Sequence, residues 1–171
     1  ALASVLIRTA SAGGGVEFGD STLTTDESAV LYAAGYDAEG NYRGAQSVTW
    51  SSTGDLDAVS GTGTSYTFRP QTASTSGTIV ATAGSFSDAT GTITVNGGAL
   101  SYVLIRTAAN NGGTEFGTFS LTTDQSVTLY SAGYDNDDNY LADQSVDWST
   151  TGSLDDTTAT GASFVFAPVS T

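Results

Sequence analysis

The densest set of potential ligand side chains is an acidic stretch at residues 135–139, Asp-Asn-Asp-Asp-Asn. Oxygens at Asp135, Asp137 and Asn139 alternate as in the first half of a calcium-binding loop, and calcium takes roughly six to eight oxygen ligands. Asp37 and Glu39 form a thinner set earlier in the chain. These residues predict calcium as the candidate cofactor, although the distal glutamate and the helices of an EF-hand are missing. Asp, Asn and Gly also favour turns and keep an acidic surface soluble, so a purely structural role stays open.

Tyrosines in two strand-like segments, AVLYAAGY and VTLYSAGY, form a second candidate site. Side chains alternate between the two faces of a strand, so Tyr32 and Tyr36 share a face, and Tyr130 and Tyr134 repeat the arrangement. An exposed strand face with tyrosines suits contact with a glycan or with a host surface protein. The alternative is that these rings belong to the core, since large aromatic side chains are mostly buried.

Catalytic groups are scarce in this sequence. It contains no histidine or cysteine, which excludes the usual nucleophilic dyads, zinc sites and haem ligation. An enzyme would depend on carboxylate pairs such as Asp55 with Asp57 or Asp155 with Asp156. A glycosidase holds two carboxyl groups roughly 5 to 9.5 Å apart across a cleft, which neighbours in one short loop rarely provide. We therefore predict that the protein is not an enzyme.

Acidic residues dominate the charge balance of the 171-residue chain. Its 18 Asp and Glu side chains stand against four arginines and no lysine, for a formal net charge of −14. Binding of nucleic acid needs a basic surface, so nucleic acid is excluded as a partner. No stretch approaches the roughly 20 apolar residues of a membrane helix, so membrane insertion is not expected. A chain rich in Thr, Ser and Asp, with few sites for trypsin-like proteases, favours an extracellular or cell-surface location.

An internal repeat organises the chain, because VLIRTA begins at Val5 and again at Val103, 98 residues later. The segments EFG, LTTD, AGYD, NY and QSV all recur at the same offset, with no insertion or deletion between them. The sequence therefore predicts two copies of one unit, joined head to tail. The first copy covers residues 1–98 and the second covers residues 99–171.

Short runs of alternating apolar and polar residues predict an all-β fold, since helical periodicity is absent. Val48 and Trp50 share one face of their run and are predicted to lie in the core. About seven short strands in roughly 100 residues, with a Trp on a central strand, are typical of an immunoglobulin-like β-sandwich. In the first copy, the runs predict strands at residues 5–9, 29–36, 47–52, 65–69, 78–83 and 92–95, with a weaker strand at 21–24.

The segment AGYDAEGNYRGAQSVTW resembles the bacterial Ig-like repeat domains of invasin- and intimin-type adhesins and related large surface proteins. In that pattern a strand ends in Asp, a Gly-Asn turn follows, and the next strand carries Val-x-Trp. The matching positions are Asp37, Gly40, Asn41, Val48 and Trp50 in the first copy, and Asp135, Asn139, Val146 and Trp148 in the second. Asp138 replaces the turn residue Gly40, so the second loop departs from the pattern. The resemblance implies a module that serves as a spacer, an adhesive tip or an enzyme appendage.

The predicted fold is two tandem immunoglobulin-like β-sandwich repeats, the second of which lacks its last two strands. Residue 171 matches residue 73, so the second copy has no counterpart of residues 74–98, which contain two predicted strands. Three explanations stay open. The chain is a fragment of a longer array, or residues 74–98 complete the second copy instead of the first, or another chain supplies the strands.

Together these patterns predict a structural or adhesive extracellular module, a tandem Ig-like spacer or stalk of a bacterial surface protein. Calcium would stiffen its acidic loops, and its partners would be other copies of the same repeat or chain. One alternative is a self-assembling filament subunit, completed by strand donation from a neighbouring chain. Another is an accessory module that binds a glycan or a protein through the tyrosines.

Overall fold

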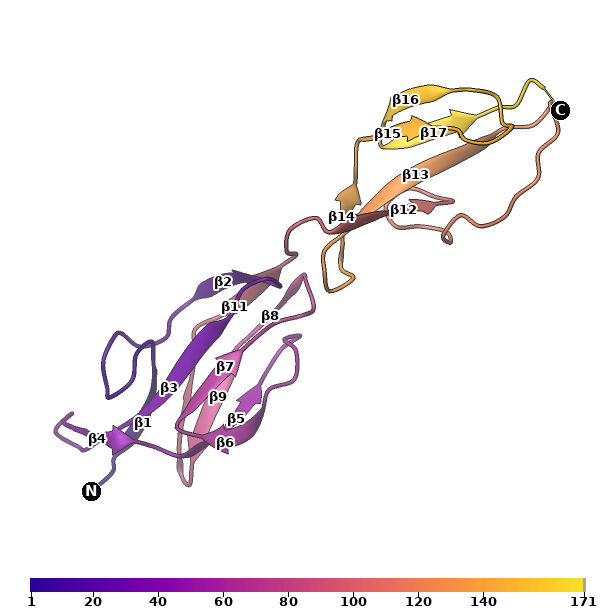
Figure 1. Ribbon diagram of the computed structural model, residues 1–171. Helices are drawn as coiled ribbons and strands as arrows, with labels where there is room; N and C mark the ends of the chain where they lie inside the picture. Colours follow the sequence, from indigo (N-terminus) through magenta and orange to yellow (C-terminus); the bar gives the residue numbers. More distant parts are fainter. Residues whose placement is uncertain (171) are drawn as a thin grey trace. The chain divides into compact units, whose positions relative to one another are not determined.

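In the computed structural model, which describes residues 1–170, the chain forms two compact units, Ala1–Gly98 (unit 1) and Ala99–Thr171 (unit 2). Each unit is built from β-strands, which can be followed along the ribbon in Figure 1. The predicted all-β fold is confirmed, and its several sheets are compatible with a β-sandwich. The described residues include no helix that is long and apolar enough to cross a membrane.

Unit 1 contains three sheets. In the first, β3 pairs with β1, β4 and β7, and in the second the strand order is β10-β9-β5-β6. In the third, β11 lies between β2 and β8, and its pairing with β2 is parallel. The strands of this unit are β1 (Ser4–Arg8), β2 (Ser21–Thr24), β3 (Ala29–Tyr36), β4 (Tyr42–Ala45), β5 (Val48–Ser52), β6 (Ser60–Gly63), β7 (Ser65–Phe68), β8 (Thr75–Gly77), β9 (Ile79–Ala83), β10 (Phe86–Ala89) and β11 (Ile93–Asn96).

Alternation along each strand decides which side chains form the core of unit 1. On β5, Val48 and Trp50 are buried while Thr49 and Ser51 are exposed, as the period of two predicts. The Trp50 indole N–H donates a 3.2 Å hydrogen bond to the Gly63 carbonyl oxygen on the neighbouring strand β6. A buried Trp is satisfied in this way without losing its apolar contacts. The core also includes Val5, Ile7, Leu23, Leu31, Leu56, Phe68, Ile79, Ala81, Ile93 and Val95.

Residues 74–98 belong to unit 1. Strand β9 pairs with β5, where Ala81 lies opposite Trp50, and β11 pairs with β2, where Val95 lies opposite Leu23. The interpretation that these residues complete the second copy is therefore wrong. The segment also contributes the short strands β8 and β10, in addition to the two strands that were predicted there. Strand β8 reads Thr-Ser-Gly and β10 reads Phe-Ser-Asp-Ala, so neither has a run of alternating apolar residues that would predict a strand.

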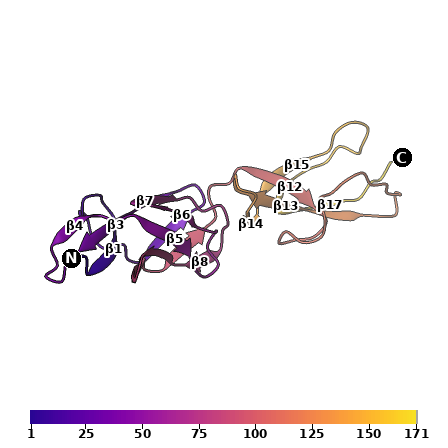
Figure 2. The same cartoon turned by 90° about the horizontal axis from the view of Figure 1, so that it is seen from below.

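Unit 2 repeats part of this arrangement. Strand β13 pairs with β12, β14 and β17, and among the described residues 99–170 the strand β15 pairs with β16 alone. The Trp148 indole N–H donates a 2.8 Å hydrogen bond to the Gly161 carbonyl oxygen, as its counterpart does in unit 1. Figure 2 gives a second view of these strands and of the loops between them. They are β12 (Tyr102–Arg106), β13 (Val127–Tyr134), β14 (Tyr140–Asp143), β15 (Val146–Ser149), β16 (Thr158–Gly161) and β17 (Ser163–Phe166).

Candidate functional site

The acidic loops follow a β-bulge that is present in both units. The register shifts between Gly35 and Tyr36 in β3, and between Gly133 and Tyr134 in β13. A Cβ atom on Gly35 would lie 2.7 Å from Cγ of Gln46, and one on Gly133 would meet the corresponding glutamine at 2.5 Å. A side chain at either glycine would overlap the glutamine side chain that packs against it, and the aspartate that begins the turn follows directly after the bulge.

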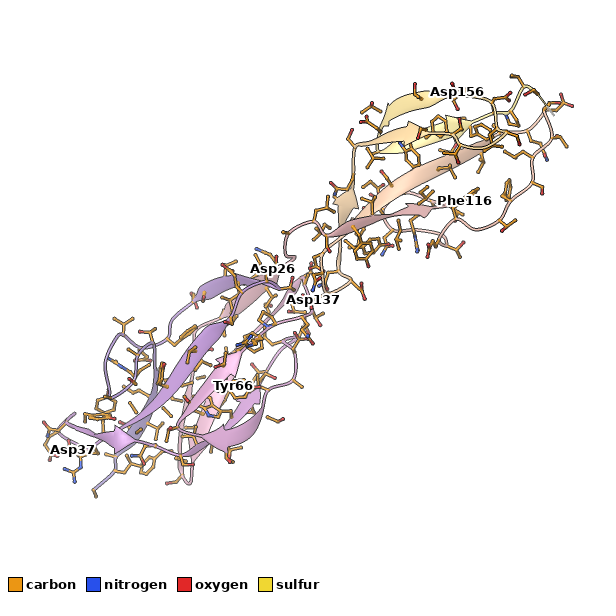
Figure 3. The ribbon with its side chains drawn as sticks, viewed as in Figure 1. Asp26, Asp37, Tyr66, Phe116, Asp137 and Asp156 are labelled. Atoms are coloured by element: carbon orange, nitrogen blue, oxygen red, sulfur yellow. The ribbon has the colours of Figure 1, made fainter. Side chains whose placement is uncertain are left out.

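In unit 1 the Asp37 carboxylate is held by the backbone of its own turn. Its Oδ1 atom accepts hydrogen bonds from the N–H groups of Asn41 at 2.8 Å and Glu39 at 3.2 Å, and the Asn41 side-chain amide contacts both oxygens. The hydrogen bond from the Asn41 N–H, with the further donors, holds the pKa of Asp37 below its ordinary value of 3.8. Figure 3 shows Asp37 at the tip of its loop.

The loop of unit 2 has the same geometry around Asp135, which is buried. Its Oδ1 atom accepts hydrogen bonds from the N–H groups of Asn139 at 2.8 Å and Asp137 at 3.0 Å. Asp138, in place of Gly40, adopts the same left-handed backbone, with φ of 66° against 80°. The departure from the repeat pattern therefore leaves the turn unchanged.

The hydrogen bonds within the two acidic loops occupy the carboxylate that the calcium prediction places first in each loop. In both loops the first aspartate faces N–H donors of the same turn, which is the arrangement of an Asx turn. Glu39 and Asp137 each donate a backbone N–H to that aspartate. Within residues 1–170 no three acidic, His or Cys side chains converge as a metal cluster would. Calcium at these loops stays a prediction.

The predicted contact tyrosines differ in their exposure. Tyr32, Tyr36 and Tyr130 are half-buried, whereas Tyr134 is buried. The Tyr134 ring stacks on Tyr102 with 5.2 Å between ring centroids. Three of the four candidate rings thus keep part of their surface accessible, and the fourth is enclosed by its neighbours.

Two hydrogen bonds from phenol groups to carboxylates distinguish unit 2 from unit 1, and sequence reasoning missed them. The Tyr102 hydroxyl donates a 2.6 Å hydrogen bond to Asp138, and the Tyr140 hydroxyl donates a 3.0 Å bond to Asp143. The bond to Asp138 raises the pKa of Tyr102 to about 12, because an adjacent carboxylate disfavours the phenolate. Unit 1 has Ser4, Gly40 and Ala45 at the positions of Tyr102, Asp138 and Asp143, so comparison of the two copies was the available signal.

The carboxylates considered for catalysis include one that clamps a loop in each unit. Asp57 accepts hydrogen bonds from the N–H groups of Gln71 at 2.6 Å and Thr72 at 3.1 Å, and also from the Thr72 hydroxyl. Asp155 binds the N–H groups of Val169 and Ser170 in the same way. Burial raises the pKa of Asp57, but the three hydrogen bonds outweigh it and the net shift is downward. Asp57 and Asp155 therefore each hold a loop in place by accepting hydrogen bonds from its backbone.

Two of the four arginines are used inside the loop that follows the first strand of each unit. Arg8 Nη2 donates to the Gly15 carbonyl oxygen at 2.6 Å, and Arg106 Nη2 donates to the Gly113 carbonyl oxygen at 3.0 Å. In the described part of the chain, Arg106 Nε is buried without a hydrogen-bond partner. Two of the four basic side chains in the sequence therefore donate hydrogen bonds to backbone carbonyl oxygens of their own unit.

An open apolar groove distinguishes unit 2 from unit 1. Its volume is about 340 Å³, and Phe116, labelled in Figure 3, belongs to its lining. Leu56 of unit 1 is 7% exposed, whereas Leu154 at the same repeat position is 56% exposed. Ile7 on β1 has no exposed surface, whereas Ile105 on β12 is 42% exposed. Apolar positions that are covered in unit 1 are thus open in unit 2.

The groove is open because its covering strands have no counterpart within residues 99–170. In unit 1, β9 and β10 pack against β1, and Asp88 of β10 accepts a 2.6 Å hydrogen bond from the Ile7 N–H. Residues 119–122 correspond to β2 but form no strand, because the parallel partner of β2 in unit 1 is β11. Sequence comparison of the two copies indicates this groove, and the structure shows which side chains line it.

Comparisons with protein-family models, with curated proteins and with solved structures find no match to this chain. The functional argument therefore depends on the repeat, the loops and the groove.

Proposed function

We propose that the protein is a structural module, a tandem Ig-like spacer or stalk segment of a bacterial surface protein located outside the cell. The observation that carries this proposal is the 98-residue repeat, which recurs without insertion and keeps the same bulge, aspartate turn and Trp hydrogen bond in both units. A repeat that conserves its scaffold contacts, and places its carboxylates in turns, suits a mechanical role better than a catalytic one.

The charge composition supports the same role. A net charge of −14 keeps neighbouring copies apart and soluble, and the near absence of basic residues leaves few sites for trypsin-like proteases. Both properties suit an array of repeats exposed to an extracellular medium. An adhesive role would use the half-buried tyrosines Tyr32, Tyr36 and Tyr130 for a glycan or a host surface protein.

The test displays one, two or four copies of the chain between a bacterial outer-membrane anchor and an epitope. The distance between epitope and membrane is measured by fluorescence quenching or super-resolution imaging. A spacer of stiff units extends this distance in proportion to the number of copies. Growth with the square root of copy number, as in a flexible coil, would contradict the proposal.

Two further arms of that experiment separate the other predictions. If calcium stiffens the acidic loops, EDTA shortens the measured distance, and Asp135→Asn with Asp137→Asn reproduces the shortening in calcium. For the accessory-module alternative, the purified chain is applied to a glycan array. Binding that is lost in Tyr32→Ala and Tyr130→Ala variants would favour recognition over spacing.

The groove of unit 2 is the observation that favours a filament subunit as a second candidate. Strand donation between chains would cover the exposed apolar side chains and pair the open strand edges. Sedimentation of the 171-residue chain over a range of concentrations tests it: ordered assemblies favour the filament, and a monomer at every concentration is evidence against self-donation.

A further inference from the structure

The tripeptide Asn-Gly-Gly occurs twice in the chain, at residues 96–98 and at residues 111–113, in two different surroundings. An asparagine followed by glycine is the pair in which the backbone reacts most readily with a side chain, because glycine has no Cβ atom to hinder its nitrogen. The two tripeptides match in sequence, so a difference in their reactivity in the folded protein would come from the structure. The hydrogen bonds at each tripeptide therefore decide which asparagine reacts.

The reaction is an intramolecular substitution at the asparagine side chain. The glycine nitrogen forms a bond to Cγ, the bond from Cγ to Nδ2 breaks, and the proton of the glycine nitrogen leaves with the amide as ammonia. The product is a five-membered succinimide ring, which water opens at either carbonyl carbon to give aspartate or isoaspartate. Water is the only co-reactant. The glycine N–H must be free of hydrogen bonds, and the side chain must be free to turn toward it.

At the second tripeptide, hydrogen bonds hold both reacting groups. The Gly112 N–H donates to the Ala109 carbonyl oxygen at 2.9 Å, across a turn whose two central residues have left-handed backbones. The side-chain oxygen of Asn111 accepts a hydrogen bond from the Tyr134 hydroxyl. The backbone carbonyl oxygen of Asn111 accepts another from Arg106 Nη2 at 3.1 Å. Rotation of the asparagine toward the glycine nitrogen breaks these three contacts.

At the first tripeptide, the reacting groups are not held in this way. Asn96 is the last residue of β11, and its side chain is exposed because the alternation along the strand turns Val95 into the core. Among the described residues, none accepts a hydrogen bond from the Gly97 N–H and none bonds to the side-chain amide of Asn96. The contact that must yield is the 3.1 Å hydrogen bond from the Thr25 N–H to the Asn96 carbonyl oxygen.

We propose that Asn96 is a site of spontaneous deamidation, at which the folded protein converts a side-chain amide at the end of β11 into aspartate and isoaspartate, whereas Asn111 is protected. The two sites differ by two hydrogen bonds, so we expect conversion at Asn96 to be at least about tenfold faster. This inference does not depend on the spacer role, because it concerns a single peptide bond of unit 1.

Conversion would change the end of the pair formed by β2 and β11. Asn96 lies opposite Thr24 in the parallel ladder, and isoaspartate adds one carbon atom to the backbone at that point. Asp26 is close to this segment, since a Cβ atom on Gly98 would lie 2.5 Å from one of its carboxylate oxygens. The new carboxylate therefore adds a negative charge near one that is already present, and we expect the ladder to open at its end.

The experiment incubates the purified 171-residue chain at mildly alkaline pH and follows its peptic fragments by mass spectrometry. Deamidation replaces an amino group by a hydroxyl group and raises the mass of the fragment. In denaturant, the two matched tripeptides should convert at similar rates, which gives the reference. In the native chain, Asn96 should convert at least about tenfold faster than Asn111. Equal native rates, or an Asn96 that stays intact while the denatured chain converts, would overturn the proposal.

Variants of unit 2 test the protecting contact. Tyr134→Phe removes the hydroxyl that holds the Asn111 side chain, so it should accelerate conversion at Asn111 and leave Asn96 unchanged. Tyr102→Phe is the matched control, because this hydroxyl donates to Asp138 instead. Trp148 fluorescence reports whether unit 2 stays folded in each variant. Equal rates at Asn111 in the two folded variants would contradict protection by this hydrogen bond.

A variant of unit 1 tests the chemistry at the reactive site. Asn96→Gln keeps an exposed amide at the end of β11, but its ring closure would need one more atom than a succinimide contains. The mass increase in the fragment with residues 96–98 should therefore disappear. An increase that persists in this variant would show that another group reacts, and it would overturn the assignment of the site to Asn96.

Discussion

Truncation of one isoleucine in each unit measures how much the covering strands contribute to the core. Ile7 and Ile105 occupy the same repeat position on β1 and β12, but Ile7 is fully buried and Ile105 is 42% exposed. Ile7→Ala and Ile105→Ala therefore delete the same atoms from two different environments. We expect the first substitution to destabilise unit 1 much more than the second destabilises unit 2.

The magnitudes follow from burial. Replacement of Ile by Ala removes three carbon atoms, and at ~0.8 kcal/mol per buried carbon the transfer loss at a fully buried site is about 2.4 kcal/mol. The cavity left in the closed core of unit 1 brings the total to about 3–4 kcal/mol. At Ile105 a little over half of the side chain is buried and water already reaches the remainder, so the loss is about 1.4 kcal/mol. The difference of about 2 kcal/mol corresponds to roughly 30-fold in an opening equilibrium.

Amide hydrogen exchange followed by mass spectrometry is the assay, because peptic fragments report on the two units separately. Protection should fall in fragments of unit 1 for Ile7→Ala, and only slightly in fragments of unit 2 for Ile105→Ala. Equal losses in the two units would refute the argument, since they would mean that Ile105 is covered in solution.

Three other substitutions test individual contacts. Gly77→Ala should destabilise unit 1 by about 1–3 kcal/mol in denaturant unfolding, because a Cβ atom there would lie 2.0 Å from a backbone carbonyl oxygen. Gly19→Ala is the control: no atom lies within 4 Å of its added Cβ, so the stability of unit 1 should change little. Asp138→Asn should lower the pKa of Tyr102 from about 12 toward 10 in an absorbance titration, because the negative charge beside the phenol is lost. In the wild type, the stability that this hydrogen bond contributes is present below pH 10 and is lost as the pH rises between about 10 and 12. Asp57 has a lowered pKa, so its contribution to stability is present above about pH 3.8 and lost as the pH falls through its folded value; Asp57→Asn should make acid unfolding less steep, and an unchanged profile would contradict the clamp.

Strands with strong apolar alternation could be predicted from the sequence. The run at residues 29–36 coincides with β3, and even the weaker run at 21–24 coincides with β2. Here local pattern and tertiary environment agree, because one face of each strand meets the core. The alternation of Val48 and Trp50 on β5 was predictable for the same reason.

Strands held mainly by pairing could not be predicted. The strand β6 reads Ser-Gly-Thr-Gly and has no buried side chain, yet it pairs along β5 and receives the Trp50 hydrogen bond through Gly63. Strand β4 is similar, since its residues pair with β3 and remain mostly exposed. Backbone hydrogen bonding to a neighbour leaves no periodic signature in the strand that receives it.

The acidic loops show why ligand-like spacing is weak evidence for a ligand. Alternate oxygens at Asp135, Asp137 and Asn139 predict calcium, but the same spacing arises when an aspartate accepts hydrogen bonds from N–H groups two and four residues later. Sequence spacing fixes neither the direction of a carboxylate nor its partner. The loop in unit 1, with Asp37 in the same contacts, indicates that the turn itself requires this residue.

Comparison of the two units shows how the same turn is formed with Gly40 in unit 1 and with Asp138 in unit 2. A side chain in the left-handed region is unfavourable for most residues, and glycine avoids that cost. Unit 2 also changes the residue facing the turn, from Ser4 to Tyr102, and the new phenol donates a hydrogen bond to the new carboxylate. Either change alone would leave a left-handed aspartate without this donor or a phenol without this acceptor. The pair therefore keeps the turn that follows the bulge, and it explains why a departure in sequence produces no departure in backbone.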